Sequence, residues 1–380
     1  MNKKNRKRLI EISSVFSVFF ILFLMMEFTS SVIYYQKNKS SFDPTFSTVS
    51  AFKFIIKNFS KKNKTKYQTK IDNINNLRKN NQNTYPSYYF NPRLHYDLST
   101  YHLAHPIETE IVYCKEDEGW ITFKSDEIGF RNPSGQINTE MEYIFIGDSF
   151  TEGACVNKES TFAGTFRKNG LSVFNLGRSG SGPLFQLAAL KEYGALVKSK
   201  QILWFVFTAN DLANLREEKT TKLMSYLEQT DYSQNLFKNR NLNSEKLKSF
   251  LDGEIKNFQK RLDLNLKNSF NDTAFETLDE IELKKEVKLF NDVANKILIE
   301  SKKLNSKLSI VIINHPKYDH NIQDITSNAI IDFAIKNNTN YFVLSRDELI
   351  KMQETIYSKY LGHFSATGYE YIAKKLINEL

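Results

Sequence analysis

The chain has 380 residues, with 52 Lys and Arg, 43 Asp and Glu, and a net charge of +9 at pH 7. Residues 1–80 carry 16 Lys and Arg and 4 Asp and Glu, so residues 81–380 have a net charge of −3. Because the positive charge is concentrated near the N-terminus, a nucleic-acid groove in the remainder is not indicated. The length allows one large domain or two small ones.

The N-terminus combines a basic leader with an apolar segment. Residues 1–8 contain five Lys and Arg, and Glu11 and Glu27 bound the 15 uncharged residues that follow. That is short for a membrane span, but the apolar flanks extend it over residues 9–35. We predict a transmembrane signal anchor there, with the leader in the cytoplasm and the rest of the chain outside it. The alternatives are a cleaved signal peptide, for which residues 29–31 are a poor cleavage site, and a core helix.

Residues 36–106 are predicted to be a basic linker and an irregular lead-in. Residues 57–84 are dense in Lys and Asn and poor in apolar residues. This composition favours a solvated tether, and the alternative is a segment that lies on anionic lipid or glycan.

From residue 107 onward, the pattern predicts a single domain, 107–380, in which strands and helices alternate. A hairpin is expected over 107–124. Further strands are predicted at 142–146, 171–175, 201–207, 308–313 and 340–344, and helices at 160–169, 183–198, 246–268, 280–304, 323–336, 347–358 and 366–379. This alternation indicates an α/β fold with a doubly wound, flavodoxin-like parallel sheet and helices on both faces. The polar stretch 212–280 interrupts it and is predicted to be a helical insertion, either a lid or partner-binding element or a plain decoration.

A Gly147-Asp148-Ser149 motif follows the strand predicted at 142–146 and precedes a segment that could begin a helix. In open α/β sheets, ligands bind at this end of a strand. The N–H groups of a helix N-terminus can also stabilise a negative oxygen. The alternative is an ordinary strand-to-helix turn, in which Gly, Asp and Ser are common.

Three further motifs follow in chain order. Asn-Leu-Gly-Arg-Ser-Gly-Ser-Gly at 175–182 and Ala-Asn-Asp at 209–211 each follow an apolar strand, and Gly-His-Phe-Ser-Ala-Thr-Gly-Tyr at 362–369 leads into the last helix. Together the four motifs resemble the sequence blocks of the SGNH hydrolases, also called GDSL-type esterases, over about residues 140–380. Thr208 stands where that family usually has glycine.

The resemblance implies a catalytic role for four residues. Ser149 would be the nucleophile and His363 the base that takes its proton, since a serine hydroxyl is a poor nucleophile until it is deprotonated. The backbone N–H groups of Ser149 and Gly180 and the side-chain amide of Asn210 would form the oxyanion hole. Such preorganised donors are each worth about 3–4 kcal/mol in acyl transfer.

One departure from the family pattern concerns the acid that orients the histidine. The family normally has Asp three residues before the histidine, where this chain has Tyr360. Three explanations are open: another group, such as a backbone carbonyl, Asp347 or Asp319, holds the ring; the enzyme is a slower Ser–His dyad; or the protein is a degenerate binder. Asp148 and Asp211, beside the motif residues, are expected to support the site.

The other histidines do not have the spacing of metal ligands. His95, His102 and His105 lie in an irregular aromatic stretch. His315 and His320 flank a short segment after a predicted strand, where a surface loop is favoured over a place in the site. We therefore expect neither a metal site nor a cofactor.

The chain has two cysteines, Cys114 and Cys155. Outside the cytoplasm they could form a disulfide, which would tether the strand near Val112 to the catalytic loop. Two buried free thiols are an equally open alternative.

Members of the SGNH superfamily hydrolyse or transfer acyl groups. Outward-facing, membrane-anchored bacterial members often resemble enzymes that modify exported polysaccharides, including the alginate acetyltransferases. Residues 126–133 also resemble a lead-in found before the first motif in extracytoplasmic members. We therefore expect a serine-dependent O-acyl esterase or acyltransferase, most simply for O-acetyl groups on an extracytoplasmic glycan. It would be held in the inner membrane by a single span and could work with polysaccharide-assembly proteins. The alternatives are a catalytically weak glycan-binding or assembly subunit and a lipid esterase or thioesterase.

Overall fold

The computed structural model describes residues 73–87, 100–115, 120–263, 280–358 and 362–380, all within one unit of the chain, Lys70–Leu380. The predicted leader and transmembrane anchor, residues 1–8 and 9–35, lie outside the described residues. Within the described ranges, no helix combines the length and the apolar character needed to cross a membrane.

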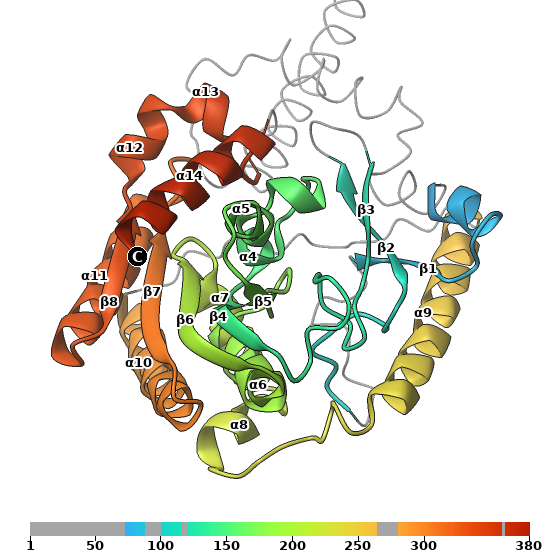
Figure 1. Ribbon diagram of the computed structural model, residues 1–380, viewed down its shortest axis with the longest axis horizontal. Coiled ribbons are helices and arrows are strands. Elements are labelled where there is room, and N and C mark those ends of the chain that lie inside the picture. Colours follow the sequence, from blue (N-terminus) through green and yellow to red (C-terminus); the bar gives the residue numbers. More distant parts are fainter. Residues whose placement is uncertain (1–72, 88–99, 116–119, 264–279, 359–361) are drawn as a thin grey trace, which may run out of the picture. The chain divides into compact units, whose positions relative to one another are not determined.

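Five parallel strands form the central sheet, in the order β5-β4-β6-β7-β8 (Figure 1). The strands are β4 (Glu140–Ile146), β5 (Val173–Asn175), β6 (Lys198–Phe207), β7 (Lys307–Ile313) and β8 (Asn340–Leu344). In order of the sequence this is 2-1-3-4-5, the order of the flavodoxin-like sheets. The prediction of an α/β fold with a parallel sheet flanked by helices is confirmed.

Helices cover both faces of this sheet, and each face has its own core. Ile144 and Ile146 of β4 point into one core and Phe145 points into the other, because successive strand residues face opposite sides. The first core includes residues of α6 (Pro183–Tyr193), α7 (Asp211–Glu218), α8 (Met224–Glu228), α10 (Glu280–Lys303) and α11 (His320–Lys336). The second includes residues of α4 (Ser149–Glu152), α5 (Phe162–Lys168), α12 (Arg346–Lys351), α13 (Gln353–Ile356) and α14 (Ala366–Glu379).

Side chains at the helix starts explain where several helices begin. Thr161 accepts a hydrogen bond from the Gly164 N–H at the start of α5, and Ser365 does the same for the Gly368 N–H at the start of α14. Each bond satisfies a backbone donor that has no partner within the helix. At α6, Pro183 occupies the first turn, where a missing N–H costs no hydrogen bond.

A second, smaller sheet is built from β1 (Thr84–Pro86), β2 (Glu110–Lys115) and β3 (Trp120–Lys124), in that order. β2 and β3 pair antiparallel, as the predicted hairpin requires, and β1 pairs parallel to β2. Within the range predicted to be linker and irregular lead-in, 36–106, the residues of β1 are therefore part of a sheet.

The predicted insertion, 212–280, contains most of α7, the short α8 and the long helix α9 (Arg240–Asp263), while residues 264–279 lie outside the described ranges. α9 runs beside the small sheet (Figure 1). Asp252 of α9 accepts hydrogen bonds from Arg78 at 2.5 Å and from the Tyr85 hydroxyl at 3.3 Å. The described part of the insertion thus packs on residues that precede the Gly147-Asp148-Ser149 motif.

Candidate active site

Three neighbouring strands bring the predicted site residues to one edge of the sheet. Ser149 begins α4 directly after β4, Gly180 lies in the loop after β5, and Asn210 lies between β6 and α7. β5, β4 and β6 are adjacent and parallel, so their carboxyl ends meet at the same edge. The strand order reverses at β4, and such a switch point is where ligands bind in doubly wound sheets.

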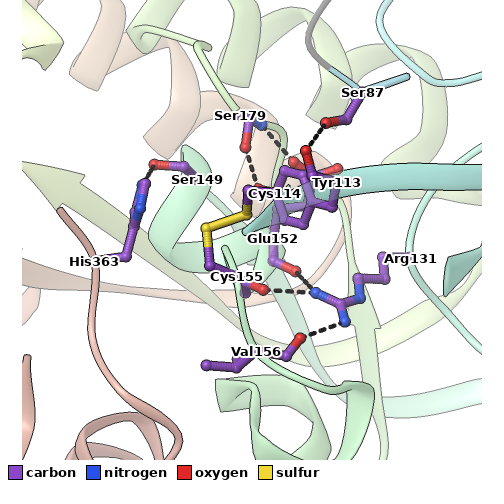
Figure 2. The surroundings of a disulfide bond; sticks show 11 residues. Ser87, Tyr113, Cys114, Arg131, Ser149, Glu152, Cys155, Val156, Ser179 and His363 are labelled. Carbon is purple, nitrogen blue, oxygen red and sulfur yellow. Dashed lines mark hydrogen bonds between the residues drawn. A yellow bond between two sulfur atoms is a disulfide. The ribbon is translucent and has the colours of Figure 1, made fainter. Parts of the chain in front are cut away.

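The nucleophile and base predicted from the sequence lie within hydrogen-bonding distance. Ser149 Oγ is 3.0 Å from His363 Nε2, although the two residues are 214 positions apart (Figure 2). The Ser358 N–H donates to the His363 carbonyl at 2.9 Å, which ties His363 to the residues that follow α13. The imidazole also packs against Phe150, with ring centroids 5.2 Å apart. This geometry suits transfer of the serine proton to the imidazole.

Asp148 places a buried carboxylate beside this pair. Its Oδ1 accepts the Phe150 N–H at 3.0 Å and so caps α4, while Oδ2 lies 3.5 Å from Ser149 Oγ. Burial raises the pKa of Asp148 to about 6, even though the Phe150 N–H and the nearby His363 favour its ionised form. Above that pH, Asp148 is a negative charge near the imidazole.

The loop after β6 presents Asn210 next to Asp148. The Asn210 amide hydrogen-bonds the Asp148 carboxylate, and Asn210 Oδ1 is buried without a partner among the residues described. Asp211 Oδ2 accepts the Phe207 N–H at 2.9 Å, which ties the loop to the end of its strand. Burial and the charge of Asp148 raise the pKa of Asp211 well above its usual value. Asp211 therefore supports the loop through this hydrogen bond to the end of β6.

Thr208, at the position where the resemblance to the SGNH hydrolases would place glycine, has polar partners. It is fully buried, and its hydroxyl lies 2.8 Å from Asn314 Oδ1 and 3.2 Å from Gln323 Oε1. The Thr208 N–H donates to the Ile313 carbonyl of β7 at 3.1 Å. Thr208 thus anchors the loop that carries Asn210 to the end of β7, the neighbouring strand.

The loop after β5 packs tightly against α4. A Cβ atom at Gly177 would lie 2.6 Å from the Glu152 nitrogen, so only glycine fits at this position. The Arg178 N–H donates to the Gly147 carbonyl at 3.0 Å, which fixes the loop beside the residues just before Ser149. Gly180 has a φ of 76°, in the left-handed region that favours glycine.

A buried carboxylate that the sequence analysis did not identify holds this loop to α4. Glu152 is 1 % exposed; its Oε2 accepts the Ser179 N–H at 2.7 Å, and its Oε1 lies 2.7 Å from His105 Nε2. Arg178 Nη1 lies 3.5 Å from the same carboxylate. Burial opposes ionisation of Glu152, but Arg178 and His105 outweigh it and hold its pKa well below the usual range. The sequence offered one signal for this ion pair: Glu152 lies in the first turn after Ser149, and Arg178 lies in the second motif.

Cys114 and Cys155 form a disulfide, which decides between the two alternatives left open by the sequence (Figure 2). The bond joins β2 to the turn that follows α4. Arg131 supports the same turn by donating to the Gly153 carbonyl at 2.6 Å and to the Val156 carbonyl at 2.8 Å. The segment that carries Ser149 is therefore anchored at its far end by a covalent bond and a buried guanidinium.

The prediction of a surface loop was wrong for His315. Its side chain is fully buried, and its ring packs against Tyr357 and Tyr318 with centroids 4.4 Å and 4.8 Å apart. His320, by contrast, is exposed at the first residue of α11. His95 lies outside the described residues. Within the ranges described, no cluster of three His, Cys, Asp or Glu could hold a metal ion.

The two carboxylates considered as substitutes for the family's acid are both exposed. Asp319 caps α11 by accepting the Asn321 N–H at 2.8 Å, and Asp347 lies in the first turn of α12. Neither is the buried carboxylate that a triad places behind its histidine. Tyr360 lies outside the described residues.

No family model matches the sequence, and no curated protein matches it. Among solved structures, the chain is similar to a protein from Desulfitobacterium hafniense DCB-2 assigned to the G-D-S-L family of lipolytic proteins, with 13 % identity, a TM-score of 0.38, and 63 % of this chain and 100 % of that one covered. It is also similar to the psychrotrophic esterase EstA from a Pseudoalteromonas species, with 10 % identity, a TM-score of 0.34, and coverage of 63 % and 95 %. The acetylxylan esterase Axe2 from Geobacillus stearothermophilus gives 12 % identity, a TM-score of 0.34, and coverage of 64 % and 96 %.

Proposed function

We propose that this protein is a serine-dependent O-acyl esterase or acyltransferase of the SGNH type that acts on O-acetyl groups of an extracytoplasmic glycan. The observation that carries the proposal is the 3.0 Å distance between Ser149 Oγ and His363 Nε2 at the switch point of the parallel sheet. An ordinary strand-to-helix turn would not place an imidazole from a distant segment on its serine. The four motifs in family order give the same assignment.

The reaction proceeds through an acyl-enzyme. His363 accepts the hydroxyl proton while Ser149 Oγ attacks the acyl carbonyl carbon, and the carbonyl oxygen becomes negative. The N–H groups of Ser149 and Gly180 and the amide of Asn210 stabilise this oxygen. The carbon–oxygen bond to the sugar then breaks, and the protonated His363 gives its proton to the departing sugar oxygen, which leaves as a hydroxyl. Water as the second acceptor completes hydrolysis, and another sugar hydroxyl completes transfer.

Asp148 contributes to the same step. A positive imidazolium forms on His363 in the transition state, and the ionised Asp148 carboxylate near it lowers the energy of that charge. Asp148 approaches the serine rather than the rear of the imidazole ring, so it acts through its charge and not by orienting the ring. It is a partial substitute for the acid that Tyr360 replaces.

Two observations support a place outside the cytoplasm. Cys114 and Cys155 form a disulfide, and disulfides persist mainly in oxidising compartments outside the cytoplasm. The lead-in that resembles extracytoplasmic members is also part of the fold, because Asn132 donates to the Asn175 carbonyl of the second motif at 2.9 Å. With the N-terminal signal anchor, the protein would be a single-pass protein of the inner membrane with its site outside. A reporter fused after residue 60 should be active only outside the cytoplasm, and activity inside would contradict this topology.

The catalytic proposal is tested with the full chain in detergent and a fluorophosphonate probe, followed by intact-protein mass spectrometry. The parent should be labelled, while Ser149→Ala and His363→Ala should not. Absence of labelling in a parent shown to be folded would overturn the proposal. Acetate release from an O-acetylated oligosaccharide, compared with p-nitrophenyl palmitate hydrolysis, then separates a glycan substrate from a lipid one.

A further inference from the structure

We propose that Tyr113 is a positioning residue for the oxyanion hole: its hydroxyl holds Ser179 and thereby fixes the direction of the Gly180 N–H. The inference rests on the proposed function, because that function gives the Gly180 N–H its role. Tyr113 belongs to β2, which is outside the central sheet that carries the catalytic motifs. One residue of β2 would therefore support the site from outside the central sheet.

The argument begins with a tight turn at residues 178–181. The Ser181 N–H donates to the Arg178 carbonyl at 3.1 Å, which closes a four-residue turn. Gly180 is the third residue, and its φ of 76° is the value that a type II turn requires there. The Gly180 N–H belongs to the peptide unit between Ser179 and Gly180. Rotation of this unit relates turns of types I and II, and it would reverse the direction of the N–H.

Ser179 is anchored through two different atoms. Its N–H donates to Glu152 Oε2 at 2.7 Å, and its Oγ is hydrogen-bonded to the Tyr113 hydroxyl. Figure 2 shows both bonds beside the disulfide. Burial raises the pKa of Tyr113 well above its usual value, so the hydroxyl keeps its proton and can donate. With Ser179 held at both atoms, the next peptide unit has little freedom to rotate.

The two anchors are tied to each other by a covalent bond. Tyr113 is adjacent to Cys114, whose partner Cys155 lies three residues after Glu152. The Tyr113 ring is further held by Phe123, with centroids 5.8 Å apart, and by the Arg131 guanidinium 5.8 Å from its centroid. These contacts involve the ring and not the hydroxyl. The hydroxyl also hydrogen-bonds the Glu152 side chain, so Tyr113→Phe removes both of its hydrogen bonds and leaves the ring packing in place.

A double-mutant cycle tests the proposal on the full chain, with p-nitrophenyl acetate as substrate. Tyr113→Phe and Ser179→Ala should each lower kcat by about 3–10-fold, the value of one hydrogen bond, with KM nearly unchanged. The double variant should lose no more than Tyr113→Phe alone, since that variant already lacks the bond between Tyr113 and Ser179. Tyr85→Phe is the matched control, because its hydroxyl binds Asp252 at 3.3 Å, away from the site, and it should keep the parent kcat.

Hydrogen exchange of the peptide spanning 176–182 gives a readout that does not depend on turnover. Exchange should be faster in Tyr113→Phe than in the parent and unchanged in Tyr85→Phe. Unchanged kcat and exchange in Tyr113→Phe, or losses that add in the double variant, would overturn the inference. If the parent hydrolyses no ester, the proposed function fails, while the exchange rates still decide whether Tyr113 holds the loop.

Discussion

Removing the disulfide should lower the stability of the domain by an amount that follows from its position. Cys114 and Cys155 are 41 residues apart in the sequence. Closing a loop of that length restricts the unfolded chain, and the loop-entropy relation gives about 4 kcal/mol at 25 °C. Cys114→Ser combined with Cys155→Ser should therefore reduce the free energy of unfolding by about that amount, a large share of a typical total of about 5–15 kcal/mol.

Urea unfolding measures this loss. Trp204 is fully buried in the central strand of the sheet, so tryptophan fluorescence reports on unfolding of the core. Four samples are compared: the parent and the double Ser variant, each with and without reductant. The reduced parent should match the variant, and the variant should not respond to reductant.

Two results would refute the reasoning. A variant within about 1 kcal/mol of the oxidised parent would show that the bond does not restrict the unfolded chain as the loop-entropy relation requires. A variant that loses stability on reduction would show that the reductant acts elsewhere in the protein.

Three further predictions concern residues of the site. Asn210→Ala should lower kcat by about 10²–10³-fold, and an effect confined to KM in steady-state kinetics would argue against an oxyanion role. Asp148→Asn keeps the cap on α4 but removes the charge, so the ratio of parent to variant kcat/KM should be greatest above pH 6 and shrink as the pH falls through about 6; a ratio that stays constant from pH 5 to 8 would contradict this. Glu152→Gln leaves Arg178 as a buried charge without its counter-ion and should cost about 3–5 kcal/mol in urea unfolding, whereas a loss below about 1 kcal/mol would show that the pair is not needed.

The central sheet could be predicted because its strands are continuous apolar runs between helices with clear starts. Burial on both faces produces that pattern directly. β1 could not be predicted in this way, because its three residues lie in a stretch rich in Lys and Asn and are ordered by pairing with β2, whose first residue is 26 positions later. The four-residue helix α4 is similarly too short to have a periodic pattern.

The candidate site could be predicted only for those of its residues that lie in one of the four sequence motifs. Ser149, Gly180, Asn210 and His363 are each marked by their neighbours in the sequence. Tyr113 is not marked in this way. Glu152 lies close to Ser149 in the sequence, but its role does not follow from that, because the contacts of Tyr113 and Glu152 with Ser179 span 66 and 27 positions and depend on how β2 and α4 pack. The burial of His315 was missed for a related reason, since two of the rings that pack on it, Phe207 and Tyr357, belong to segments far away in the sequence.

The central claim is that Ser149 forms an acyl-enzyme with His363 as its base. The most direct measurement mixes the full chain with p-nitrophenyl acetate, quenches in acid within milliseconds, and locates the acetyl group by peptide mass spectrometry. We predict acetyl on the peptide that contains Ser149 in the parent, and none there in Ser149→Ala or His363→Ala. Folded parent protein that carries no acetyl group on Ser149, or the same amount in the His363→Ala variant, would contradict the claim.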